Sequence, residues 1–171
     1  MLHKYLGDIH DVAILEVNCG TGSHISEVLA SKMGSIVCGI DTTPQDLAAS
    51  YAANNLAIAS HRCQIIEADP CALPFDDQSF DVVYSVNQSH TWKDRAVALA
   101  HIHRVLKMGG TFVLSVRIKG QTWLTSAGEE LSAAHHIIDT MTHIGFNVIK
   151  TEVVECSSVS NEFWIKAQRV R

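Results

Sequence analysis

Short apolar runs alternate along the chain with longer segments in which apolar residues recur at helical spacing. Strands are predicted where four or more mostly apolar residues lie between polar turns, at 13–17, 35–41, 64–68, 81–86 and 111–116. Helices are predicted between these strands, at 23–33, 43–56 and 94–107, each with capping or turn residues at its ends. The last part of the chain predicts a helix at 129–143 followed by two strands at 147–154 and 163–168.

This order of elements predicts an α/β fold, a three-layer sandwich around a mostly parallel seven-stranded sheet. Strand–helix–strand units cross over right-handedly, so helices cover both faces of the sheet. The two last strands are separated by a short polar loop, which predicts a C-terminal antiparallel hairpin at one edge. A chain of 171 residues is expected to form one domain, 1–171.

Polar residues that suit a ligand gather at the predicted strand ends. Glu16 lies in the first strand, Asp41 ends the second and Asp69 follows the third. Between the first strand and its helix, Gly20 and Gly22 allow the backbone to approach a ligand closely. Since ligands of such sheets bind beyond the carboxyl ends of the strands, we expect these residues to share one crevice.

A glycine turn of this kind is also compatible with a dinucleotide cofactor. The dinucleotide fingerprint asks for a third glycine where this chain has Ile25, which disfavours close packing of a pyrophosphate on the helix. Asp41 follows at the distance expected of an acid that binds ribose, and both classes of nucleoside cofactor need that acid. An NAD-linked oxidoreductase is therefore the less favoured alternative.

Three segments resemble one family. Residues 66–81, IEADPCALPFDDQSFD, are similar to the methyltransferase segment usually written GDAxxLPFxDxSFD. Residues 104–110, RVLKMGG, resemble RVLKPGG, with Met108 in place of the usual proline, and residues 143–146 resemble the AGF step before the sixth strand. Over residues 11–155, the chain resembles class I (Rossmann-like) S-adenosylmethionine-dependent methyltransferases of the small-molecule type, including the quinone-biosynthesis enzymes.

The resemblance implies S-adenosylmethionine as the cofactor and a small molecule as the methyl acceptor. Glu16 would face the ammonium group of the cofactor, and Gly20 and Gly22 would pass close to its methionine and ribose. Asp41 would accept hydrogen bonds from the ribose hydroxyls, and Asp69 would accept one from the adenine amino group. Carboxylates suit a cationic cofactor that is rich in donors. The further cofactor-binding positions that the resemblance implies are Asn18, Thr42, Pro70 and Ser85.

Asn18 and His90 have expected roles that differ from those of the acids and the glycines. Asn18 occupies a position that is usually glycine, and Asn is the best non-glycine residue if the backbone there has positive φ. We expect the turn to persist with weaker cofactor affinity. His90 matches a histidine common in the acceptor-facing segment of the family, so it is the candidate catalytic base. Its alternative role is that of a helix-entry histidine hydrogen-bonded to backbone.

Composition narrows the partners and the compartment. The net charge is −5 and no basic block is present, so a nucleic-acid partner is not expected. The five cysteines form no CxxC pair, which indicates reduced thiols and a cytoplasmic location. No leader or membrane-spanning apolar run is expected, and no His, Cys and acid spacing indicates a metal site.

The acceptor side of the site is the least defined from sequence. About 12 residues precede the first predicted strand, where the family usually has helices that cap the acceptor. The acceptor pocket could be open, completed by a second subunit in a homodimer, or absent. The alternative to an enzyme is therefore a non-catalytic cofactor-binding or interaction module of the same fold. Residues 119–127 could fold over the site.

Overall fold

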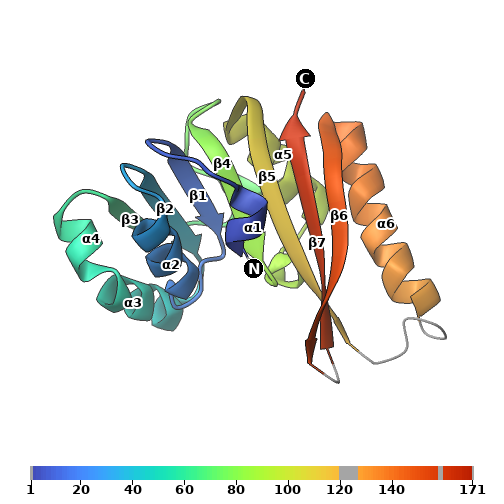
Figure 1. Ribbon diagram of the computed structural model, residues 1–171, viewed down its shortest axis with the longest axis horizontal. Helices are drawn as coiled ribbons and strands as arrows, with labels where there is room; N and C mark the ends of the chain where they lie inside the picture. The colour runs from blue at the N-terminus through green and yellow to red at the C-terminus, as the bar shows by residue number, and fades with distance from the viewer. Residues whose placement is uncertain (1, 120–126, 158–159, 171) are drawn as a thin grey trace.

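The computed structural model describes residues 2–119, 127–157 and 160–170 (Figure 1). Its seven-stranded sheet has the order β3-β2-β1-β4-β5-β7-β6, with β7 antiparallel to both of its neighbours. The predicted fold class is confirmed, including the C-terminal hairpin at one edge of the sheet. The strands are β1 (Ala13–Val17), β2 (Ile36–Asp41), β3 (Cys63–Glu67), β4 (Phe80–Val86), β5 (Leu106–Lys119), β6 (Phe146–Ser157) and β7 (Ser160–Arg169).

Helices cover both faces of the sheet and divide the core into two apolar clusters. Side chains alternate along each strand, so Ile14 packs with the helices of one face and Leu15 with those of the other. The first face carries α1 (Leu2–Leu6), α2 (Ser23–Ser31), α3 (Pro44–Ala53) and α4 (Asn55–Ala59). The second carries α5 (Arg95–Val105) and α6 (Ala127–Ile144), and two single 3₁₀ turns are η1 (Pro70–Ala72) and η2 (Ser89–Thr91).

Several predicted boundaries differ from the structure, among them those of α5, α3 and α2. The helix predicted to reach Lys107 ends at Val105, because Leu106 already pairs with Phe80 as the start of β5. The helix predicted over 43–56 is interrupted at the buried residue Asn54, whose side-chain amide donates to the carbonyl oxygens of Gly22 and Ser50. Ser23 does not cap α2: it is the first helical residue, and Gly22 is the N-cap.

Helix α1 has no counterpart in the sequence prediction. Its Tyr5 ring stacks on Trp164 of β7 with ring centroids 4.9 Å apart, and the Tyr5 hydroxyl donates to Glu152 of β6 at 2.8 Å. Lys4 forms an ion pair with the same carboxylate at 2.8 Å. Because α1 is only five residues long, tertiary contacts and not helix propensity must stabilise it. In Figure 1, α1 lies across the sheet in front of β4 and β5.

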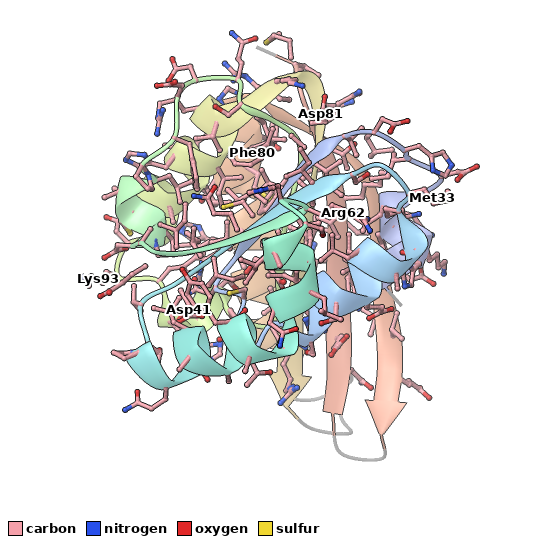
Figure 2. The ribbon with its side chains drawn as sticks, turned by 90° about the vertical axis from the view of Figure 1, so that its left-hand side faces the viewer. Met33, Asp41, Arg62, Phe80, Asp81 and Lys93 are labelled. Atoms are coloured by element: carbon pink, nitrogen blue, oxygen red, sulfur yellow. The ribbon has the colours of Figure 1, made fainter. Side chains whose placement is uncertain are left out.

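Asp81 joins the amino-terminal ends of two central strands. Its Oδ2 accepts a hydrogen bond from the backbone N–H of Ala13 at 2.9 Å, and Lys107 forms an ion pair with the carboxylate at 2.8 Å. Burial alone would raise the pKa of Asp81, but the bonds from Lys107 and Ala13 outweigh it and lower the pKa. Figure 2 shows Asp81 at the end of the sheet opposite to Asp41, so this last residue of the similar segment supports the fold.

Replacing Asp81 with alanine is expected to lower the free energy of unfolding by about 1–2 kcal/mol at neutral pH, because the Ala13 N–H and Lys107 lose their acceptor. The folded-state pKa is depressed, so this contribution is present above the ordinary pKa of 3.8 and is lost as pH falls below it. Urea unfolding at neutral and acid pH measures both effects. Asp76→Ala, at an exposed position of the same segment, is the control. Equal stability of the two variants at neutral pH would contradict this role.

Candidate functional site

The carboxyl ends of β1, β2 and β3 bring the predicted ligand-binding acids to one edge of the sheet. Glu16 is the next-to-last residue of β1, Asp41 is the last residue of β2, and Asp69 lies two residues after β3. These strands are adjacent and parallel, so their ends meet at the same edge. Figure 2 shows Asp41 at this end of the molecule, together with Lys93 from the segment that follows β4.

Asp41 holds two turns together with its carboxylate. Its Oδ1 accepts hydrogen bonds from the backbone N–H groups of Thr42 and Thr43 at 2.8 and 2.9 Å, and its Oδ2 accepts one from Gly20 at 2.9 Å. A carboxylate offers about four lone-pair sites, so about one remains free, on Oδ2. The geometry therefore suits one strong bond from a ribose hydroxyl, while a second hydroxyl would have to share an oxygen.

The two glycines of the turn have different physical roles. Both have positive φ, 52° at Gly20 and 77° at Gly22. A Cβ atom at Gly20 would meet nothing within 4 Å, whereas a Cβ atom at Gly22 would lie 2.3 Å from the Ser50 hydroxyl oxygen on α3. Gly20 thus leaves its outer side open to a ligand. Gly22 is required by the close packing of the turn against α3.

Asn18 has a φ of 56°, so the left-handed backbone considered for this position is present. Its buried side-chain oxygen accepts a hydrogen bond from the indole N–H of Trp92 at 2.8 Å. Trp92 lies between β4 and α5 and is itself buried. The bond ties the turn after β1 to the segment after β4, across the edge where the acids lie.

Glu16 is a buried carboxylate with a partner on each oxygen. Only 1% of the residue is exposed. Tyr84 of β4 donates its hydroxyl to Oε2 at 3.0 Å, and His24 of α2 lies with Nδ1 3.3 Å from Oε1. Burial raises the pKa of Glu16, while the bonds from His24 and Tyr84 act in the opposite direction.

Asp69 lies at the more exposed side of the edge. Its Oδ1 accepts the N–H of Cys71 at 2.9 Å and caps η1, whose first residue is the buried Pro70. Lys93 forms an ion pair with Oδ2 at 2.7 Å. The hydrogen bond from Lys93, followed by that from Cys71, lowers the pKa of Asp69. An incoming amino group would share Oδ2 with Lys93.

The remaining predicted residues lie around these acids in different environments. Thr42 is exposed next to Asp41, and His90 is exposed in η2. Ser85 of β4 is fully buried, and its hydroxyl has no hydrogen-bond partner among the described residues. Since neighbouring strand residues point to opposite faces, Ser85 faces α5 and α6, away from Tyr84 and Glu16. The roles of Ser85 in cofactor binding and of His90 in catalysis stay predictions.

A cavity of about 330 Å³ opens beside Glu16, between α2 and the ends of β4, β5 and β7. His24 connects the cavity with the strand-end acids, because it contacts the Glu16 carboxylate and also lines the cavity. Glu162 accepts hydrogen bonds from the side-chain nitrogens of Asn87 and Trp164, which fix its carboxylate. Arg117 is exposed and forms no ion pair with another described residue. The lining is Leu2, His24, Glu27, Val86, Asn87, Gln88, Arg117, Glu162 and Trp164.

Four residues of the site and the cavity were not predicted from the sequence: His24, Tyr84, Arg117 and Glu162. One signal was available for Tyr84: a buried tyrosine usually needs a partner for its hydroxyl, and Glu16 lies in the neighbouring predicted strand. Nothing in the sequence pairs Arg117 with Glu162, which face each other only because β5 and β7 are antiparallel neighbours. Residues 120–126, which include most of the segment considered as a cover for the site, lie outside the described residues.

The donor and acceptor pattern of the edge fits S-adenosylmethionine. Its ammonium, ribose hydroxyls and adenine amino group are all donors, and Glu16, Asp41 and Asp69 offer acceptors in that order along the edge. The open side of Gly20 leaves room for close approach between the first two acids. Among the described residues, no group of three His, Cys, Asp or Glu side chains is placed to hold a metal ion. None of the described helices is long and apolar enough to cross a membrane.

Comparison with known proteins agrees with this geometry. Residues 15–114 match the model of a methyltransferase domain family. The 2-methyl-6-phytyl-1,4-hydroquinone methyltransferase of Synechocystis is 36% identical over 102 residues, covering 60% of this chain and 31% of that protein. The chain spans only about a third to a half of the length of such curated relatives.

Solved structures share the fold over almost the whole chain. The [4+2]-cyclase SpnF superimposes with a TM-score of 0.82 at 17% identity, covering 99% of this chain and 79% of that one. A SAM-dependent methyltransferase of Methanosarcina mazei gives 0.77 at 19% identity, covering 99% and 96%. The family match includes the glycine turn, all three acids and β4, and the family it identifies is a methyltransferase family and not an oxidoreductase family. The chain belongs to the methyltransferase-domain family of class I, whose cofactor is S-adenosylmethionine.

Proposed function

We propose that this domain transfers a methyl group from S-adenosylmethionine to a small-molecule acceptor whose reacting group enters the cavity beside Glu16. The observation that carries the proposal is the set of three acids at adjacent strand ends, with the open face of Gly20 between the first two. The bound cofactor supplies an electrophilic methyl carbon on a cationic sulfur. The residues of the chain then contribute by binding and orienting, which accelerates a bimolecular step by bringing the partners into line.

The lining of the cavity supports a polar acceptor group such as a hydroxyl, carboxylate or amine. Asn87, Arg117 and Glu162 face the cavity from the ends of three strands, and His24 and Glu27 face it from α2. Placing an alkyl chain against these groups would bury polar atoms without partners, which is costly. Arg117, a cation without an ion-pair partner among the described residues, suits an acceptor that carries a negative group. His90 does not line this cavity, so its role as a base is the less supported part of the proposal.

Two further proposals concern the cellular location and the oligomeric state of the protein. A cytoplasmic location is supported by the four free cysteines among the described residues, Cys19, Cys38, Cys63 and Cys71. A homodimer that completes the acceptor site is supported by the position of the cavity, which is lined by the exposed Arg117 and reaches the surface. Mass measurement in solution tests the dimer.

Calorimetric titration with S-adenosylmethionine and S-adenosylhomocysteine tests the cofactor, with NAD as the control. We expect micromolar or tighter binding of the first two and none of NAD, because Ile25 replaces the third glycine of the dinucleotide fingerprint and disfavours close packing of a pyrophosphate on α2. Methyl transfer is then followed by formation of S-adenosylhomocysteine with a panel of phenols, carboxylic acids and amines. Cofactor binding without transfer to any of them would favour a non-catalytic binding module, and absence of binding would contradict the proposal as a whole.

A further inference from the structure

Both oxygens of the Glu16 carboxylate are already used by the chain itself. Tyr84 donates to Oε2 at 3.0 Å, and His24 lies 3.3 Å from Oε1. With 1% of the residue exposed, Glu16 has no open side that an ammonium group could approach directly. Because Glu16 is buried, a cofactor whose ammonium group binds it must displace a side chain that covers it, and His24 and Tyr84 are the side chains that contact its oxygens.

The two partners differ in their freedom to leave. Tyr84 is fully buried in β4, whose neighbours β1 and β5 hold it on both sides, and its ring belongs to the apolar cluster under α2. His24 lies in the first turn of α2, and 37% of its side chain is exposed. It also lines the cavity of about 330 Å³, so the ring can turn away from Glu16 without any movement of the helix.

We propose that His24 is a cofactor-positioning residue, which holds Glu16 in the ligand-free domain and yields it to the ammonium group of the cofactor by turning into the cavity. The inference rests on the proposed function, since it takes Glu16 as the acceptor of that group. The exchange replaces one hydrogen-bond donor beside Glu16 with another, so the buried carboxylate keeps a partner in both states. That continuity matters because an unpaired buried carboxylate is strongly destabilising.

The charged groups around His24 determine how cofactor affinity changes with pH. The hydrogen bond to Glu16 is the main cause that raises the pKa of His24 above 6.5, and Glu27 on its own helix and Glu162 on β7 add to it. Arg117 on β5 is the cation that faces the same cavity. When the ring leaves Glu16 it loses the largest of these contributions, so its pKa falls. Cofactor binding then releases a proton, and affinity rises with pH by up to about tenfold per pH unit.

The test is calorimetric titration of the whole chain with S-adenosylhomocysteine at about pH 6 and about pH 8, in buffers of different ionisation enthalpy. For the wild type we expect tighter binding at the higher pH, and an observed enthalpy that depends on the buffer because the released proton is taken up. His24→Asn keeps a donor but cannot titrate, so both dependences are expected to disappear. His10→Asn, which removes an exposed histidine whose ion-pair partner among the described residues is Asp8, is the control and is expected to behave as the wild type.

A second probe separates this inference from the proposed function. 5′-Methylthioadenosine lacks the amino-acid group, so it is expected to bind without the pH dependence and without proton release. Binding of S-adenosylhomocysteine that is independent of pH, or equally dependent on pH in His24→Asn, would overturn the role of His24 and leave the cofactor assignment standing. Failure of both nucleosides to bind at either pH would overturn the proposed function, and this inference with it.

Discussion

Alanine in place of Gly22 is expected to destabilise the domain by about 3 kcal/mol, which for a chain of this length lowers the melting temperature by roughly 6–12 °C. Two costs add. The new Cβ would lie 2.3 Å from the Ser50 hydroxyl oxygen and 2.6 Å from the Asn54 side-chain nitrogen, so α3 would have to shift. The φ of 77° costs a residue with a Cβ another ~1–2 kcal/mol. Thermal and urea unfolding of the purified variant measure the total.

Gly20→Ala is the matched control, because it also places a Cβ on a residue of positive φ but meets nothing within 4 Å. We expect it to cost only the backbone part, ~1–2 kcal/mol. Its larger effect should be on binding, since the added methyl group occupies the side from which the cofactor approaches. Equal destabilisation by the two substitutions would show that packing against α3 is not what requires glycine at position 22.

Loss of the Asp41 carboxylate is expected to weaken binding of S-adenosylhomocysteine by roughly 30–150-fold, equivalent to about 2–3 kcal/mol. Asp41→Ala removes the acceptor for a ribose hydroxyl. It also removes the acceptor for three backbone N–H groups, which belong to Gly20, Thr42 and Thr43, so the turns lose their fixed positions. Because these N–H groups can turn to water, we expect the domain to remain folded.

Titration calorimetry measures this loss, and circular dichroism checks that the fold is retained. Asp46→Ala removes the same charge from the first turn of α3, away from the turn after β1, and is expected to leave affinity unchanged within about twofold. If Asp41→Ala binds the nucleoside as tightly as Asp46→Ala does, the carboxyl end of β2 is not the ribose site.

The parts of the fold that could be predicted from the sequence are those where local pattern and tertiary structure agree. The five parallel strands are buried on both faces, so they read as continuous apolar runs, and polar turns mark their ends. The same logic located Glu16, Asp41 and Asp69, because a parallel sheet places all its carboxyl ends at one edge.

The features that could not be predicted from the sequence depend on contacts between residues far apart in the chain. The end of α5 was placed too late because Leu106 already pairs with Phe80 of β4, and that pairing overrides the helix propensity of Leu106 and Lys107. His24 was missed because its value lies in its distance to Glu16, which depends on how α2 packs over β1. The indole bond of Trp92 to Asn18 could not be foreseen either, because it joins positions 74 residues apart.

The anchoring of α1 has a consequence for how the chain is made. The partners of Tyr5 and Lys4 lie near the other end of the chain: Glu152 on β6 and Trp164 on β7. During synthesis Tyr5 and Lys4 therefore lack these partners until β6 and β7 have left the ribosome, although His3 can already contact Glu27 of α2. Until then β5 is also an open edge, because β7 is the strand that pairs with it. A nascent chain that has released β5 but not β7 thus leaves Tyr5 without its stacking partner and β5 without its neighbour, which makes it a suitable client for chaperones.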